Sequence, residues 1–201
     1  MNFRLERYQS GTVLDAIAAG ADLSTAQRAA AVLFVAVLTI VAAQVSIPLP
    51  FTPVPFTLQP MVVLLGGAAL GSRLGMTSQV VYLALGLAGL PVFAASPVLP
   101  QGLARLLGPT GGYLMSYPFA AFAVGYLAER GLDRRYLTSV LAMAAGLAII
   151  FTCGVAWLAV GVPHAGLTGA VRTGLLPFLL ADIVKVFLAA AVLPTTWRVL
   201  R

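Results

Sequence analysis

Long apolar stretches follow one another along this chain, and they constrain its fold more than any other feature. About 20 apolar residues in a helix cross the hydrocarbon layer of a bilayer, because a helix satisfies its backbone N–H and C=O groups internally. A transmembrane barrel would show shorter segments of alternating polar and apolar residues, and that alternation is absent. We therefore predict an all-α integral membrane protein with six transmembrane helices. The predicted spans are 28–47, 57–71, 74–90, 112–128, 136–160 and 174–193.

Composition and charge agree with a lipid environment. Apolar residue types make up 60% of the chain and charged types 9%, against roughly 45–50% and about 25% in ordinary globular domains. The net charge is +6, but the basic residues lie at predicted helix ends rather than in a patch studded with aromatic residues. This pattern argues against a nucleic-acid partner and indicates a lipid bilayer.

The distribution of arginines predicts the orientation. Six spans put both termini on one side of the membrane, and cytoplasmic segments carry the excess of Arg and Lys. With cytoplasmic termini, the outer loops hold only Arg105 and Arg172. The inner segments then hold Arg4, Arg7, Arg28, Arg73, Arg130, Arg134, Arg135, Arg198 and Arg201. We therefore expect a multi-pass membrane protein with both termini in the cytoplasm.

The chain divides into a polar N-terminal extension at 1–27 and a six-helix membrane domain at 28–201. The extension reads as a partly mobile tail with one short interfacial helix at 13–21. The second span is short, which favours tilt or close packing by protein on both sides. Near its end Gly67, Gly71 and Gly75 repeat at four-residue spacing, which lets helices approach closely. Internal packing explains the repeat, and contact with a partner protein is the alternative.

Two outer loops interrupt the apolar pattern. The first has five prolines within 48–60, so it favours extended backbone that caps a pocket or acts as a stiff connector. The second runs from 91 to 111 and contains Arg105 and the turn Thr110-Gly111-Gly112. Thr110 is expected to cap the fourth helix, whose N-terminal amides favour an anion such as a carboxylate. A capped turn with an arginine that snorkels to the interface explains these residues equally well.

Asp182 and Lys185 lie in the middle of the sixth span. Ionisable residues inside a membrane are costly and usually face a cavity or one another. Three residues apart on a helix, this pair shares a face. It either fixes helix packing, relays protons or binds a ligand. By contrast Cys153 and His164 are each single in the sequence, so the sequence predicts no disulfide, no metal site and no cofactor.

Four motifs in order along the chain resemble the BioY family, the biotin-binding S components of energy-coupling factor (ECF) transporters. They are 53–59 (PVPFTLQ), 64–71 (LLGGAALG), 82–94 (YLALGLAGLPVFA) and 107–114 (LGPTGGYL). The similarity covers roughly residues 29–195 and ends with Asp182-x-x-Lys185, which is similar to the family's last-helix motif. The N-terminal extension looks longer than is usual for the family.

The resemblance implies an S-component-like bundle that holds a vitamin under the first and third loops. It also implies that the protein lies in the cytoplasmic membrane of a bacterium or archaeon. As partners it implies a transmembrane coupling subunit and two ATPase subunits. This chain lacks a G-x-x-x-x-G-K-[ST] phosphate loop, so we expect it not to be an enzyme and expect partners to hydrolyse ATP.

The chemistry of biotin matches these residues. Biotin offers two ureido N–H donors, a carbonyl acceptor, an apolar bicycle and a carboxylate. We expect Asp182 and Lys185 to bind the ureido group through charge-assisted hydrogen bonds, and Arg105 with Thr110, Gly111 and Gly112 to hold the carboxylate. Candidate apolar walls are Tyr82, Phe93 and Tyr113. Gln79 is a further polar candidate, although a hydrogen bond between helices explains it better.

The sequence leaves three alternatives to biotin capture. One is an S-type subunit for another small vitamin, and another is a membrane scaffold protein without a small ligand. The third is an intramembrane enzyme, for which the chain supplies few candidate catalytic groups.

Overall fold

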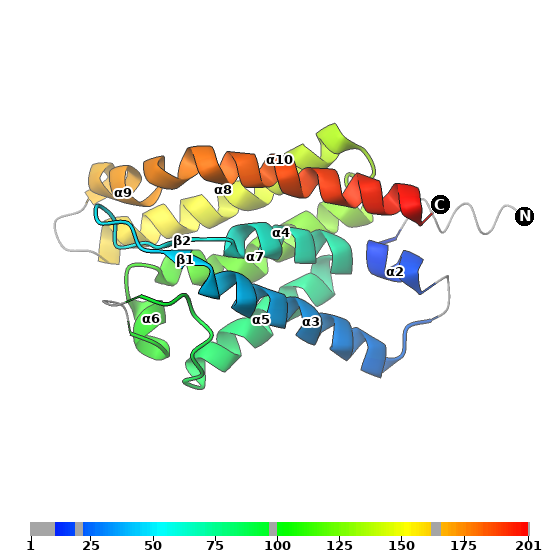
Figure 1. The fold of residues 1–201 in the computed structure, drawn as a ribbon, viewed down its shortest axis with the longest axis horizontal. Helices are drawn as coiled ribbons and strands as arrows, with labels where there is room; N and C mark the ends of the chain where they lie inside the picture. Colours follow the sequence, from blue (N-terminus) through cyan, green and yellow to red (C-terminus); the bar gives the residue numbers. More distant parts are fainter. Residues whose placement is uncertain (1–10, 19–21, 97–99, 162–165, 201) are drawn as a thin grey trace, which may run out of the picture.

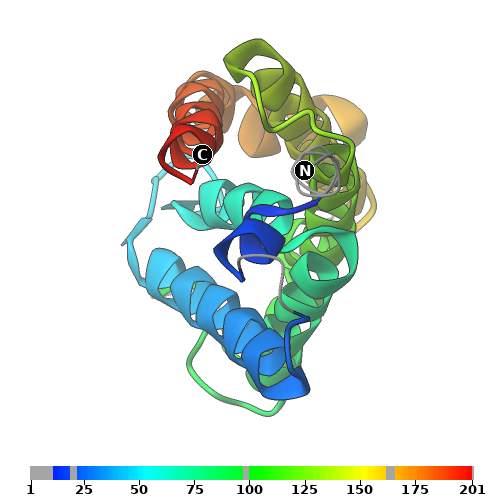
Figure 2. The same cartoon turned by 90° about the vertical axis from the view of Figure 1, so that its right-hand side faces the viewer.

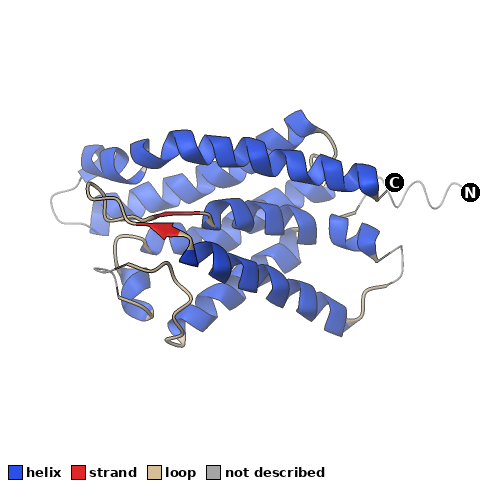
Figure 3. Ribbon diagram, viewed as in Figure 1, coloured by secondary structure: helices blue, strands red, loops and turns tan. Residues whose placement is uncertain are grey.

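A bundle of long helices forms the protein in the computed structural model, which describes residues 11–18, 22–96, 100–161 and 166–200 (Figure 1). The long helices are α3 (Thr25–Gln44), α4 (Gln59–Leu70), α5 (Ser72–Leu87), α7 (Gly111–Glu129), α8 (Tyr136–Gly161) and α10 (Leu176–Val199). The short helices are α2 (Val13–Ile17), α6 (Leu103–Leu107) and α9 (Gly166–Gly174). Figure 3 shows that the strands β1 (Ser46–Ile47) and β2 (Phe56–Thr57) are the exception in a helical chain.

The six long helices coincide with the six predicted spans to within a few residues at most ends. In the described part of the chain, α3, α8 and α10 are both long and apolar enough to cross a membrane. The helix α4 is apolar but has only 12 residues. The second predicted segment therefore forms a short helix, as expected, and a glycine ends it. Gly71 ends α4 with φ of +84°, a conformation that glycine adopts without steric cost.

Helix α7 lies at the centre and packs against α4, α5 and α8. Glycines bring the backbones close together where α4 meets α7 and where α4 meets α5. A Cβ on Gly67 would lie 2.5 Å from the carbonyl oxygen of Ala121, and one on Gly75 would lie 2.7 Å from the Cα of Gly67. The small residues thus serve internal packing, as expected, and let side chains of α7 fill the core.

The loops at one end of the bundle bind to one another. We call this the cavity end; it holds β1, β2, α6 and α9 (Figure 1). The strands pair antiparallel, with Ser46 opposite Thr57. Ser46 Oγ also donates to Ala95 O at 3.0 Å, and Thr52 Oγ1 donates to Thr173 O at 2.6 Å. The proline-rich loop is therefore held in a short hairpin that joins the third loop and α9.

The opposite end, called the far end, holds α2 and the end of α10 (Figure 1). Helix α2 falls within the predicted range 13–21 but is shorter, and it differs from an interfacial helix on a mobile tail. Its Thr12 cap and its first residue, Val13, are both buried. The helix packs against α4 and α10. Arg4, Arg7, His164 and Arg201 lie outside the described residues.

We predict that Gly67→Ala lowers the thermal unfolding temperature of the purified protein in lipid nanodiscs. Its methyl group must displace the backbone of α7, and such overpacking costs about 1–3 kcal/mol. Gly161→Ala is the matched control. A Cβ at Gly161 would lie 3.7 Å from Nε1 of the Trp157 side chain, which is an ordinary van der Waals contact. An equal shift in both variants would show that the close approach of α4 and α7 is not required.

Candidate ligand-binding site

A cavity opens at the cavity end between the first loop, the third loop and α7. The empty space between its lining residues, including the space at its open mouth, is about 330 Å³. The first loop and the start of α4 contribute Val54, Pro55, Thr57 and Gln59; the third loop and α6 contribute Phe93, Ala94 and Arg105; and α7 with its cap contributes Thr110, Tyr113, Leu114 and Tyr117. The structure therefore gathers four of the predicted site residues, Arg105, Thr110, Phe93 and Tyr113, in one lining.

Arg105 braces the wall formed by the third loop. Only 1% of the residue is exposed. Its Nε donates to Pro100 O at 2.8 Å and its Nη2 donates to Ala94 O at 2.5 Å. Burial lowers the pKa of the guanidinium from its ordinary value, but arginine stays protonated in proteins. Of the two explanations offered by the sequence, the structure rules out an arginine that snorkels to the interface, because the side chain is buried and bonded to carbonyl groups of the loop.

Thr110 contributes a buried hydroxyl to the lining. The prediction that it caps the fourth helix is wrong: it holds the N-cap position of α7, but its side chain makes no capping hydrogen bond. Its φ and ψ of −87° and −4° are helical, whereas a capping side chain normally needs an extended backbone. Its Oγ1 is buried with no hydrogen-bond partner among the described residues. Such a group is rare and calls for a partner such as a ligand or water.

Gly111 and Gly112 bring α7 close to its neighbours rather than lining the cavity. A Cβ on Gly111 would overlap the carbonyl oxygen of Leu106, and one on Gly112 would overlap Trp157. Trp157 Nε1 also donates to Gly108 O at 2.9 Å. The two glycines therefore fix the turn that presents Thr110.

Tyr113 and the other predicted aromatic residues form one connected wall. The hydroxyl of Tyr113 donates to Gly174 O at 2.8 Å, which ties α7 to the end of α9. Tyr82 lies behind the lining and contacts Phe93 edge to face, with ring centroids 5.6 Å apart, and stacks on Tyr117 at 6.5 Å. These contacts make a rigid apolar surface that suits an apolar ring system.

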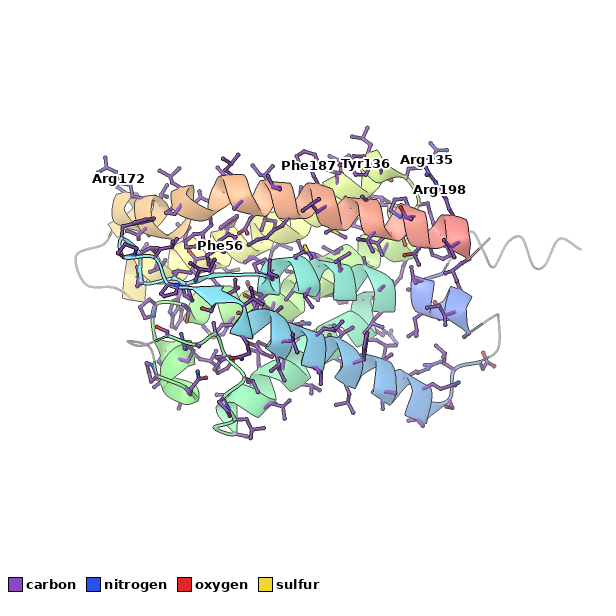
Figure 4. The ribbon with its side chains drawn as sticks, viewed as in Figure 1. Phe56, Arg135, Tyr136, Arg172, Phe187 and Arg198 are labelled. Atoms are coloured by element: carbon purple, nitrogen blue, oxygen red, sulfur yellow. The ribbon has the colours of Figure 1, made fainter. Side chains whose placement is uncertain are left out.

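Asp182 and Lys185 form the predicted pair on one face of α10. Both are buried, and Lys185 Nζ lies 2.6 Å from Asp182 Oδ1. The same Nζ donates to Thr57 O at 2.7 Å and lies 3.7 Å from the centroid of the Phe56 ring. Figure 4 labels Phe56 on the inner side of α10, where β2 runs into α4. The pair does not line the cavity itself, but Thr57 does, so one residue of β2 joins the two.

The structure does not bring Gln79 to the cavity. Its Nε2 donates to Thr39 Oγ1 at 3.2 Å, which links α5 to α3. Gln79 thus makes the hydrogen bond between helices that the sequence analysis favoured over a role in ligand binding.

Gln59 and Tyr117 line the cavity, but the sequence analysis did not identify them as site residues. Gln59 Nε2 donates to Tyr82 Oη at 2.6 Å. Tyr117 follows Tyr113 by four residues and so shares its face of α7. That spacing could have identified Tyr117, and Gln59 ends a motif already noted at 53–59.

Comparison with known proteins finds one family, several relatives and one solved structure that are similar to this chain. The sequence model of the BioY family matches residues 15–201. A probable biotin transporter BioY of Pyrococcus horikoshii is 45% identical over 153 residues, which cover 76% of this chain and 85% of the relative. The biotin transporter BioY of Thermotoga maritima is 39% identical over 155 residues, which cover 77% and 86%. A crystal structure of the S-component for biotin from an ECF-type ABC transporter matches with a TM-score of 0.76 and 26% identity, covering 89% of this chain and 94% of that one.

Proposed function

This chain belongs to the BioY family, and we propose that it captures biotin for uptake as the substrate-binding S component of an ECF transporter. The observation that carries the proposal is the pairing of an apolar cavity with two separate polar groups. Arg105 and Thr110 lie in its lining, and the Asp182–Lys185 pair lies next to Thr57. A ligand with an apolar centre and a polar group at each end fits this arrangement, and biotin has that form.

In the proposed complex the two ends of biotin bind different elements. The carboxylate accepts hydrogen bonds from Arg105 and from the Thr110 hydroxyl. Phe93, Tyr113 and the ring of Tyr117 flank the bicycle. The ureido carbonyl takes the place of Thr57 O as an acceptor for Lys185, and Asp182 accepts from a ureido N–H. Charge-assisted bonds in a site shielded from water are the strong ones, which favours tight binding.

The protein is a membrane protein, and we propose that all six long helices cross the cytoplasmic membrane with both termini inside. Figure 4 supports this orientation, because Arg172 lies at the cavity end whereas Arg135 and Arg198 lie at the far end. The cavity then opens to the outside. The extension at 1–27 and the membrane domain at 28–201 are proposed as its two parts.

We also propose partners for transport. The chain itself binds and presents the vitamin without catalysing a reaction, and a transmembrane coupling subunit with two ATPase subunits supplies the energy. The support is membership of the family together with the lack of a phosphate-loop motif in the sequence.

Removing the polar pair should abolish tight biotin binding. Lys185→Met alone leaves Asp182 as a buried unpaired charge, which costs about 3–5 kcal/mol of stability. The double variant Asp182→Asn with Lys185→Met removes both charges and so separates binding from folding. We expect equilibrium binding of labelled biotin to weaken at least about tenfold in the double variant, since bonds to charged groups contribute about 1.5–3 kcal/mol each.

Two outcomes of this binding experiment would contradict the proposal. Unchanged affinity in the double variant would remove the pair from the site. Failure of the parent protein to bind biotin would overturn the proposed function. Binding of thiamin or riboflavin in place of biotin would assign another vitamin.

Arg105 should recognise the carboxylate, so its effect should depend on that group. We expect the parent to prefer biotin over biotin methyl ester by about tenfold or more, and Arg105→Gln to lose most of that preference. The ester controls for any loosening of the third loop, because it fills the cavity without a charge. Arg172→Gln removes an exposed arginine at the same end and should keep the preference. Equal preference in parent and Arg105→Gln would assign the carboxylate to another group.

A further inference from the structure

The long helices alone do not fill the centre of the bundle at the far end, because α4 is too short to reach it. The 12 residues of α4 rise about 18 Å at 1.5 Å per residue, against about 30 Å of hydrocarbon. Its neighbour α10 has 24 residues, or about 36 Å. Figure 1 shows that α4 stops short of the far end while α10 continues. The chain turns at Gly71 and returns as α5, so another segment must fill the remaining depth.

Helix α2 fills this space. It lies beyond the end of α4 in Figure 1, and the end-on view in Figure 2 places it in the middle of the longer helices. It contacts both α4 and α10. Val13 is 6% exposed and belongs to the same buried apolar cluster as Ala68 of α4 and Trp197 of α10. Thr12 and Val13 are therefore part of the packed interior.

The local sequence makes α2 a defined helix despite its length of five residues. Thr12 and Asp15 form a capping box. Asp15 N donates to Thr12 Oγ1 at 3.2 Å, and Thr12 N donates to Asp15 Oδ2 at 2.9 Å. Such reciprocal caps satisfy backbone donors that would otherwise be buried without partners. The helix can thus enter an apolar space at low cost.

A polar cluster at the far end fastens the segment that precedes α2. Arg134 donates through Nη2 to Gly11 O at 2.9 Å, and its guanidinium lies 3.6 Å from the Trp197 ring centroid. Trp197 Nε1 in turn donates to the buried Asp133 Oδ2 at 2.6 Å. The cluster joins the N-terminal segment, the turn between α7 and α8, and the end of α10.

The turn between α4 and α5 is shaped to receive the same segment. A Cβ on Gly71 would lie 2.6 Å from Glu129 Oε1 and 2.8 Å from the methyl group of Thr12. The same Glu129 oxygen accepts from Ser72 N at 2.7 Å and from Ser72 Oγ at 2.8 Å. Glycine at position 71 therefore allows both the turn after α4 and the close packing of Thr12, the cap of α2, against that turn.

We propose that α2 is a plug that completes the short α4 span and closes the far end of the bundle. The interior is then reachable from the cavity end alone, so a ligand held there has no path to the other side while the bundle keeps this form. The proposal does not depend on which ligand the cavity binds.

The accessibility of a thiol at the far end tests the plug. Ala128 is 1% exposed and precedes Glu129, so Ala128→Cys, with Cys153→Ala to remove the native thiol, reports on this region. The probe is a positively charged methanethiosulfonate added to the protein in nanodiscs. Val13→Asp introduces a charge at a buried position and should displace α2, raising the labelling rate about tenfold or more. Arg134→Gln should raise it less.

Matched controls come from the same elements. Ile17→Asp places the same charge on the exposed face of α2, and Arg135→Gln removes the exposed arginine beside Arg134; both should leave the rate within about twofold of the parent. A second reporter, Ala120→Cys in the middle of α7, should stay unreactive with Val13→Asp. Unchanged labelling of Ala128→Cys with Val13→Asp would overturn the plug. Labelling of both reporters would also overturn it, because α2 would then support the whole core.

Discussion

The bond from Lys185 to the carbonyl of Thr57 is the interaction on which the cavity end depends. An ammonium group inside an apolar bundle must be paired, and Lys185 finds one partner on its own helix and the other on the first loop. That second bond holds β2 against α10 and so sets where the first loop turns. The hairpin then reaches the third loop through Ser46 and α9 through Thr52. The cavity therefore lies under loops that a chain of hydrogen bonds, beginning at one buried charge, links to one another.

The two ends of the bundle solve one problem in different ways. Backbone that is not in a long helix must still bury its polar groups within protein. At the cavity end, side chains such as Arg105 bind loop carbonyls, and a hollow remains between the loops. At the far end, Glu129 and Arg134 bind turn backbone, and α2 occupies the centre. This asymmetry suits a protein that takes up a small molecule from one side, which is the proposed role.

Much of this arrangement could be predicted because it depends on local rules. Apolar length located the helices, and the spacing of Asp182 and Lys185 put both on one face. The remainder depends on contacts between distant residues. The strands β1 and β2 have only two residues each, which is too short for a periodic signal. Helix α9 has nine residues and begins and ends with glycine, so it is too short to be recognised as a span. The capping role expected of Thr110 failed because the backbone before α7 is already helical. The sequence around residue 13 did not indicate that α2 would pack into the space beyond the end of α4.

The central claim is that the buried pair recognises the ureido group of biotin, with Lys185 exchanging Thr57 O for the ligand carbonyl. Infrared difference spectra of biotin labelled with ¹³C at the ureido carbonyl measure that bond directly. The account predicts that the labelled stretch moves to lower frequency on binding to the parent, because a charge-assisted bond is stronger than one to water. At saturating biotin the shift should disappear in the double variant Asp182→Asn with Lys185→Met, which leaves no unpaired buried charge. The same bound frequency in parent and variant would contradict the account.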